Sequence, residues 1–174
     1  MKPTKTAYIG LGTNLGDREA NLARAIELLK SDRLRVTRVS SLWETEPRDM
    51  LDQPWFLNQV VKVETDLFPR QLFTRGKQIE RMMGRIRTAP KGPRVIDVDI
   101  LLYGNAIVNL PGLEIPHPGI PLRRFVLEPL AELAPGLHHP ANNLTVRRML
   151  TKVKDQDVRR VQKSTDILTP DSAS

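Results

Sequence analysis

Hydrophobic and polar positions follow two different periods along this chain, and these periods predict a mixture of strands and helices. Apolar runs and period-two alternation predict strands at 6–12, 36–42 and 57–65, with Leu57, Val61 and Val63 on one face of the last. Apolar residues at helical spacing predict helices at 22–29, 69–83, 125–133 and 145–150. Asp17 is placed to cap the first of these helices and Pro69 to open the second. The chain therefore alternates strand and helix as an α/β protein.

The intervening segments carry turn and loop signals. Residues 44–54 contain two prolines and two aspartates and are predicted to form a loop. Gly104 and Asn105 predict a turn, with 107–110 as a short hairpin partner of the strand before it. Residues 1–156 are expected to form one domain, because there is no internal repeat or composition break, and residues 157–174 a polar tail.

Composition narrows the class of protein. The chain has 174 residues, 40% of them hydrophobic, which suits a soluble domain with one sizeable core. It has no cysteine, so disulfides and thiolate-bound zinc are excluded. No apolar run could span a bilayer and no signal-peptide pattern follows Met1, so a cytoplasmic setting is expected. The net charge of +7 favours an anionic partner.

The positive charge gathers in two groups. One precedes residue 97 and comprises Arg75, Lys77, Arg81, Arg85, Arg87, Lys91 and Arg94. The other lies near the C-terminus and is interpreted as a solvated helix face plus a tail. Aromatic residues make up only 5% of the chain and none falls inside either group, whereas nucleic-acid binders interleave such charges with stacking rings. A nucleotide with metal suits the first group better, although a ferredoxin-like RNA-binding domain remains an alternative.

The candidate chemistry centres on Asp97 and Asp99. They alternate with Ile96, Val98 and Ile100 in what reads as a buried strand, so both carboxylates face the same way, roughly 6–7 Å apart. Carboxylates on an apolar strand require compensating charge from arginines or from metal, and hard oxygen ligands favour magnesium. The alternative is a pair of solvated carboxylates on an edge strand.

A glycine-rich turn follows the first predicted strand. Gly10, Gly12 and Gly16 invite comparison with a dinucleotide-binding turn, but the third glycine comes one residue late and no acidic residue ends the next strand. A dinucleotide-dependent enzyme is thus a weaker alternative, and the glycines are interpreted as allowing a tight turn and close backbone approach.

Several ordered motifs resemble one known family. They are Tyr8-Ile9-Gly10-Leu11-Gly12-Thr13-Asn14, Ser40-Ser41-Leu42-Trp43-Glu44-Thr45, Asp52-Gln53-Pro54-Trp55-Phe56-Leu57-Asn58, Gly92-Pro93-Arg94-Val95-Ile96-Asp97-Val98-Asp99, Ile115-Pro116-His117-Pro118 and Arg123-Arg124-Phe125. From about residue 5 to 150 the chain resembles the 6-hydroxymethyl-7,8-dihydropterin pyrophosphokinases of folate biosynthesis. The resemblance implies a single three-layer α+β domain with a ferredoxin-like antiparallel sheet flanked by helices. It also implies a monomer that transfers diphosphate from ATP to the pterin hydroxymethyl group with two magnesium ions, with small molecules rather than nucleic acid or membrane as partners.

The resemblance also implies site residues, matched one by one. Metal ligands would be Asp97 and Asp99, which with Arg85 and Arg94 form the catalytic set. ATP would meet Lys77, Glu80, Arg87, Lys91, Arg94, Ile100, His117 and Arg123. The pterin would meet Gly12, Thr45, Glu46, Pro47, Phe56, Asn58, Asp97 and Phe125. Read without the resemblance, Phe56 and Phe125 are ordinary core aromatics, and His117 a packed loop histidine.

Four residues depart from the family pattern. Pro90 and Lys91 stand where many members have a basic residue and a tryptophan, Lys77 replaces a common glutamine, and Pro118 replaces a frequent aromatic residue. The basic segment 85–91 is expected to move and close over ATP, with closure driven more by charge than by packing.

Overall fold

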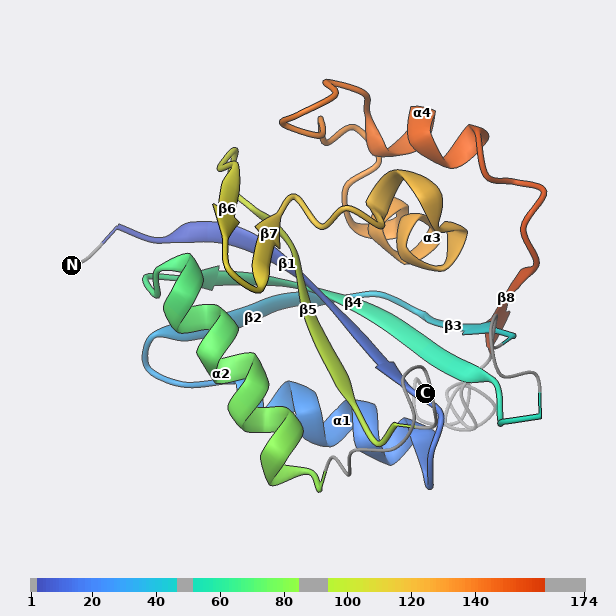
Figure 1. The fold of residues 1–174 in the computed structure, drawn as a ribbon, viewed down its shortest axis with the longest axis horizontal. Helices are drawn as coiled ribbons and strands as arrows, with labels where there is room; N and C mark the ends of the chain where they lie inside the picture. The colour runs from blue at the N-terminus through green and yellow to red at the C-terminus, as the bar shows by residue number, and fades with distance from the viewer. Residues whose placement is uncertain (1–2, 47–51, 85–93, 162–174) are drawn as a thin grey trace, which may run out of the picture.

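The structure is a computed structural model that describes residues 3–46, 52–84 and 94–161. In this part of the chain a central sheet carries helices on both faces, giving three layers (Figure 1). The elements, in chain order, are β1 (Lys5–Thr13), α1 (Arg18–Leu29), β2 (Leu34–Val39), β3 (Leu42–Thr45), β4 (Phe56–Thr65), α2 (Pro69–Met82), β5 (Asp97–Tyr103), β6 (Val108–Leu110), β7 (Leu113–Ile115), the 3₁₀ turn η1 (Ile120–Leu122), α3 (Arg124–Leu133), α4 (Val146–Thr151) and β8 (Val158–Val161).

The sheet is antiparallel at every pairing of the described strands. Its order is β5-β1-β4-β3-β8. Strand β2 pairs with residues 61–65 of β4, whereas β3 pairs with residues 56–58 of the same strand. This confirms the expected antiparallel sheet. It also removes the dinucleotide-binding alternative, because β1 lies between two antiparallel neighbours instead of in a parallel βαβ unit.

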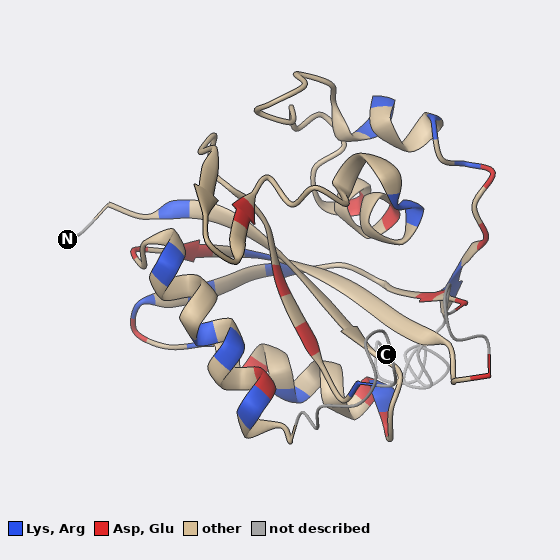
Figure 2. Ribbon diagram, viewed as in Figure 1, with Lys and Arg blue, Asp and Glu red and all other residues tan. Residues whose placement is uncertain are grey.

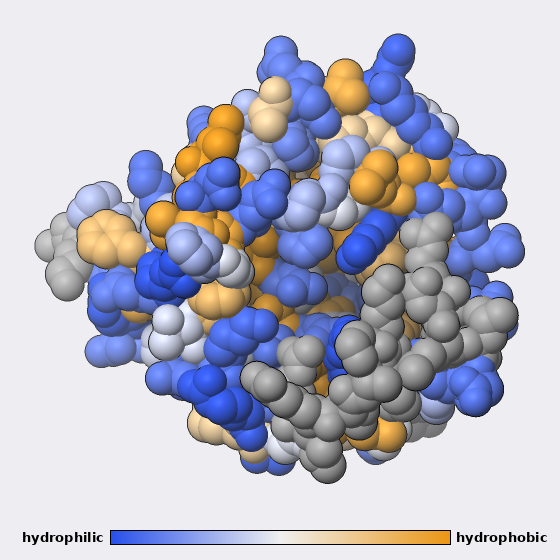
Figure 3. All heavy atoms as spheres, in the orientation of Figure 1, coloured by the Kyte–Doolittle hydropathy of each residue, from blue (hydrophilic) through white to orange (hydrophobic). Residues whose placement is uncertain are grey.

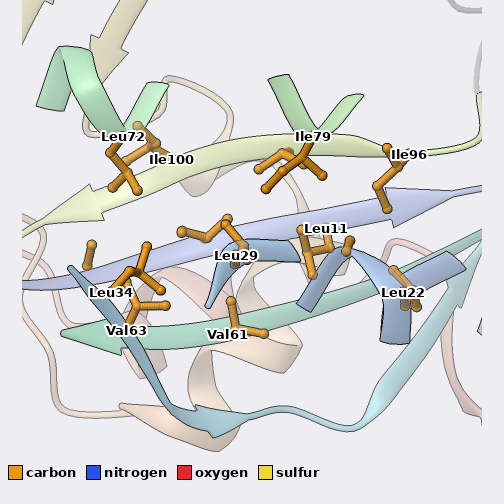
Figure 4. Close-up of a cluster of buried hydrophobic side chains, with 14 of the residues drawn as sticks. Leu11, Leu22, Leu29, Leu34, Val61, Val63, Leu72, Ile79, Ile96 and Ile100 are labelled. Atoms are coloured by element: carbon orange, nitrogen blue, oxygen red, sulfur yellow. The ribbon is translucent and has the colours of Figure 1, made fainter. Parts of the chain in front are cut away.

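Helices α1 and α2 cover one face of the sheet. Leu22 and Leu29 of α1 and Leu72 and Ile79 of α2 are buried against strand side chains in one hydrophobic cluster (Figure 4). The predicted cap is confirmed, since Asp17 accepts a hydrogen bond from the backbone of the third helical residue at 3.1 Å. Helix α1 therefore begins directly after the predicted cap Asp17, and α2 begins at the predicted Pro69.

Helices α3 and α4 cover the opposite face and form a second hydrophobic cluster with Tyr8, Val60 and Leu102. Arg38 on β2 donates a hydrogen bond to the carbonyl of Leu133 at 2.9 Å, which satisfies an acceptor at the end of α3. None of the described helices has the length and hydropathy required to cross a bilayer.

The predicted strand at 36–42 is wrong as a single element. The structure has two strands separated at Ser40 and Ser41, because the Ser40 hydroxyl accepts the Val60 amide and the Ser40 carbonyl accepts the Gln59 side chain. The Ser40 amide still donates to the Val60 carbonyl at 2.9 Å, so the chain stays beside β4 across the break. Glu44 and Thr45, predicted to lie in a loop, extend β3 instead.

The C-terminal and hairpin predictions also need correction. Residues 108–110 pair with 113–115 around Gly112 (φ 76°) and not with β5, although the predicted turn at Gly104 forms. Among the described strands β5 therefore lies at an edge of the main sheet, and the predicted buried strand is confirmed in that five of its seven residues are buried, Val98 and Ile100 to Tyr103. Residues 158–161, predicted to belong to the polar tail, form β8 and pair with β3 on the main sheet.

Candidate active site

A cavity of about 240 Å³ opens where β1, β4 and β5 meet the start of α3. On the face toward the viewer in Figure 3, hydrophobic residues lie recessed between hydrophilic ones. The lining residues come from segments far apart in the sequence: Gly10, Leu11, Gly12, Thr45, Glu46, Gln53, Phe56, Asn58, Gln59, Val60, Arg94, Asp97, Asp99, Leu101, His117, Arg123, Phe125 and Val126.

One wall of the cavity carries the acidic pair. Asp97 and Asp99 both line the cavity, while Val98 and Ile100 between and after them are buried in the cluster with α2. Figure 2 shows the resulting acidic segments along β5 beside the basic residues of α2. Arg94 Nη1 lies 3.1 Å from Asp97 Oδ2, and Asp99 is exposed. The predicted alternation is confirmed, on an edge strand.

A β-bulge in β5 shapes the cavity floor. Ile9 pairs with Ile100 and Tyr8 with Leu102, which leaves Leu101 as an extra residue on β5. Leu101 lines the cavity by the same alternation as Asp97 and Asp99, and the bulge brings Leu102 into the same hydrophobic cluster as Leu101, opposite Ile100. A Cβ at Gly10 would stand 3.4 Å from the Leu101 side chain, so the two residues are close neighbours on the cavity floor.

Glu80 supports the acidic strand from behind. It is 3% exposed on α2, and its Oε2 accepts a hydrogen bond from the Val98 backbone amide at 2.9 Å. Because β5 is an edge strand, this carboxylate takes the place of a strand partner. Lys77 Nζ lies 3.4 Å from Glu80 Oε1. Lys77, Glu80 and Ile100 do not line the cavity, and their predicted contacts with ATP stay predictions.

On the opposite wall, the lining residues of β4 are neutral. Asn58 of β4 is 7% exposed and donates from Nδ2 to the Trp43 carbonyl at 3.2 Å, which fixes the plane of its amide. Its Oδ1 lies 3.3 Å from where a Cβ at Gly12 would stand, so a side chain there would press on the amide. Phe56 lies two residues before Asn58 on the same strand, and its backbone pairs with Thr45.

Asn14 joins the two walls, and sequence reasoning assigned it no role. It is 1% exposed; its Nδ2 donates to Gln53 Oε1 at 2.7 Å and to the Pro54 carbonyl at 3.0 Å. Its Oδ1 accepts the Arg94 backbone amide at 2.8 Å, and its own amide donates to the Arg94 carbonyl at 3.1 Å. One buried amide thus fixes Arg94, three residues before the acidic strand, to the segment that leads into Phe56.

The third side of the cavity is the segment from His117 to Phe125. The His117 amide donates to the Leu101 carbonyl at 2.9 Å, and its Nδ1 accepts the Gly119 amide at 2.9 Å. Burial lowers the pKa of His117, an effect that Asp99 opposes and Arg123 reinforces. The imidazole is therefore neutral near pH 7, with Nδ1 as its acceptor. The Arg123 guanidinium lies 5.8 Å from the centre of the Phe125 ring.

The structure brings most of the predicted site residues together around this cavity: Gly12, Thr45, Glu46, Phe56, Asn58, Arg94, Asp97, Asp99, His117, Arg123 and Phe125. Pro47, Arg85, Arg87 and Lys91 lie outside the described residues, as does the whole predicted lid at 85–91. The lining residues that were not predicted include Gln53 and Leu101. Gln53 lies within a quoted motif, and Leu101 lies two residues after Asp99, so the alternation that places both carboxylates on one face also places Leu101 there.

The family model and the relatives of similar length that match this chain carry the same pyrophosphokinase name. A model of the 7,8-dihydro-6-hydroxymethylpterin-pyrophosphokinase family matches residues 8–135. A Methylorubrum extorquens protein named 2-amino-4-hydroxy-6-hydroxymethyldihydropteridine pyrophosphokinase is 43% identical over 157 residues, covering 90% of this chain and 98% of that protein. A Bacillus subtilis protein of the same name is 43% identical over 138 residues, covering 79% of this chain and 83% of that protein.

Some relatives are much longer. The folic acid synthesis protein fol1 of Pneumocystis carinii is 41% identical over 157 residues, or 90% of this chain, which spans only 21% of that protein. The fold is also similar to a solved structure of wild-type Plasmodium falciparum HPPK-DHPS with pteroate. That match has a TM-score of 0.71 at 17% identity and covers 87% of this chain and 45% of the other, which supports the fold alone.

Proposed function

This chain belongs to the 7,8-dihydro-6-hydroxymethylpterin-pyrophosphokinase family, and we propose that it transfers diphosphate from ATP to 6-hydroxymethyl-7,8-dihydropterin in folate synthesis. The pterin hydroxyl oxygen forms a bond to the β-phosphorus and loses its proton. The bond from that phosphorus to the oxygen it shares with the α-phosphorus breaks, and AMP leaves. The observation that carries the proposal is one cavity that brings three sets of groups together: Asp97, Asp99 and Arg94 on the β5 side, Asn58 and Phe56 on the β4 side, and His117, Arg123 and Phe125 on the third side.

The acidic strand suits magnesium. Asp97 and Asp99 offer hard carboxylate oxygens on one face of β5, and no group of three or more possible metal-ligating side chains occurs among residues 3–46, 52–84 and 94–161. Mg²⁺ characteristically takes one or two carboxylates and completes its shell with water and substrate phosphates, so two aspartates fit it. When bound there, magnesium supplies positive charge to phosphate oxygens and lowers the pKa of the attacking hydroxyl.

Arg94 is proposed to neutralise the migrating diphosphate. Its guanidinium lies at the cavity beside Asp97, and Asn14 holds its backbone on both sides. A planar guanidinium fits two phosphate oxygens at once, and fixed donors act more strongly as charge accumulates on the leaving phosphate. Arg123 and neutral His117 are proposed to contact ATP from the loop on the third side of the cavity.

The neutral wall is proposed to hold the pterin. Asn58 offers an amide in a fixed plane, which suits the paired donor and acceptor edge of a pterin ring. Phe56 and Phe125 both line the cavity and can stack on the flat ring, with Thr45 and Gly12 at the same wall. This arrangement would orient the hydroxymethyl group toward Asp97 and Asp99.

The test measures AMP release from ATP by the purified chain. We expect AMP to form only when both magnesium and the hydroxymethyl dihydropterin are present, with the pterin diphosphate formed in equal amount. A pterin with a methyl in place of the hydroxymethyl group is the control, because it retains the ring contacts but has no attacking oxygen. AMP formation with that analogue, or equal rates in excess chelator, would contradict the proposal.

A further inference from the structure

Four side chains from four segments meet outside the cavity. They belong to Arg18 at the start of α1, Glu44 of β3, Trp55 just before β4, and Arg159 of β8. Arg18 Nη1 lies 2.7 Å from Glu44 Oε2, and Arg159 Nε donates to Glu44 Oε1 at 2.7 Å. Arg159 Cζ also lies 4.5 Å from the centre of the Trp55 ring. We refer to these four residues as the Glu44 latch.

Glu44 is the hub of the latch. It is 7% exposed, and burial raises the pKa of its carboxyl, but the hydrogen bonds from Arg159 and Arg18 outweigh burial and hold the pKa below its ordinary value. The carboxylate is therefore ionised at neutral pH and holds both guanidinium groups. Loss of one arginine would leave a buried charge only half compensated.

The latch holds Trp55 at two points. Arg18 donates to the Trp55 carbonyl at 3.0 Å, while Arg159 stacks on its ring. Trp55 lies between Gln53 and Phe56, which both line the cavity. The other end of this short segment is tied by Asn14, so the latch supplies the remaining fixed point.

Strand β8 also supports the cavity through the backbone. Thr45, which lines the cavity, pairs with Phe56 on one side and with Val158 of β8 on the other. Residue 159 follows directly, so the strand and the latch act on the same wall. None of the four latch residues lines the cavity itself.

We propose that Arg159, acting through Glu44 and Trp55, is a positioning residue for the pterin side of the cavity. This inference rests on the proposed function. The effect should be confined to one wall of the cavity, because the latch lies next to Thr45 and Phe56 and contacts neither Arg94 nor Asp97. Loss of the latch should weaken pterin binding without slowing the transfer step, because the acidic wall keeps its geometry.

The first test compares Arg159→Ala with Arg160→Ala. Arg160 is the next residue of β8, is also exposed, and bonds to the Ser41 hydroxyl at 2.8 Å instead of to Glu44. We expect Arg159→Ala to raise KM for the pterin about fivefold, with kcat and KM for ATP within about twofold, as suits a partly exposed stacking cation. Arg160→Ala should leave all three unchanged, and Arg159→Lys should restore part of the pterin affinity. Equal changes in both KM values, or no change, would overturn the proposal.

The second test needs no activity, so it separates failure of the latch from failure of the proposed function. The chain has two tryptophans, and Trp43→Phe leaves Trp55 as the only indole. In that background Arg159→Ala should increase acrylamide quenching of Trp55 fluorescence, whereas Arg160→Ala should not. If wild-type protein makes no AMP but Arg159→Ala increases quenching as expected, the proposed reaction is contradicted while the role of the latch in holding Trp55 is supported. Unchanged quenching would remove the latch whatever the activity.

Discussion

The two walls of the cavity are built differently. On the β5 side, the cavity meets ionised groups that solvent reaches, with the Arg94 and Asp97 side chains 26% and 19% exposed. On the β4 side it meets Asn58 at 7% exposure, whose amide is fixed by the backbone of β3. The charged wall lies on an edge strand, and the neutral wall lies inside the sheet.

This difference follows from the cost of desolvation. Ionised groups lose far more free energy than amides when they are buried without partners, so a charged wall is stable in the absence of ligand only where water reaches it. An amide can be buried and fixed once its hydrogen bonds are made. The comparison teaches that an edge strand suits recognition of a polyanion, whereas an interior strand suits recognition of a neutral flat ring.

The largest expected effect comes from removing charge from the first wall. Asp99→Asn keeps the shape of the side chain and should lower AMP formation by at least about 10³-fold, by analogy with loss of a strong transition-state contact. The free energy of unfolding should stay level or rise, because like charge between Asp97 and Asp99 is relieved. Rate measurement and urea unfolding check both parts, with Asp155→Asn, an exposed acid far along the chain, as the control. Near-normal activity would remove Asp99 from the catalytic set.

A change at Asn14 can separate the two walls. Asn14→Ala removes three side-chain hydrogen bonds and takes the Asn14 acceptor from the partly buried Arg94 amide, so we expect about 2–3 kcal/mol lower stability and roughly tenfold lower kcat. Asn14→Asp can still accept the Arg94 amide but cannot donate to Gln53 and Pro54. It should therefore raise KM for the pterin more than KM for ATP. If both variants change the two KM values equally, Asn14 does not link the walls as described.

The smallest expected effect concerns pH and the support of the neutral wall. The pKa of Glu44 is lowered on folding from its ordinary value of 4.5, so its ionised form stabilises the fold above that pH. This contribution is about 1 kcal/mol, because the two arginines that pair with Glu44 are partly exposed. It is lost as the pH falls through the pKa of Glu44 in the folded protein. The difference in unfolding free energy between wild type and Glu44→Gln should shrink from pH 6 to pH 3. A constant difference over that range would mean that Glu44 does not titrate with folding.

The sequence predicted what depends on neighbours along the chain. The helix starts at Asp17 and Pro69 and the alternation at Asp97 and Asp99 all follow from local pattern. β8 was missed because Val158-Arg159-Arg160-Val161 is short and charged, and its strand character depends on pairing with β3, more than a hundred residues earlier. The role of Asn14 was missed for the same reason, since its partners lie about 40 and 80 residues away.

Most of the site residues were predicted from the resemblance of motifs to a known family, and few of them from hydrophobic pattern or charge. Phe56 and Asn58 read as ordinary strand positions, and only their places opposite Gly12 make them a wall. The bulge at Leu101 has no local signal, because a run of aliphatic residues can be in register with either face.

That bulge also determines which length changes this gene can tolerate. Before it, odd-numbered residues of β5 line the cavity; after it, Leu102 packs with α3 and Tyr103 with α2. Deleting one residue between Asp99 and Leu102 would abolish the extra position and force either the carboxylates or the aliphatic residues onto the wrong layer. Length variation among descendants of this protein should therefore accumulate at the Gly112 hairpin turn, whereas the seven residues of β5 should keep their number even where their identities drift.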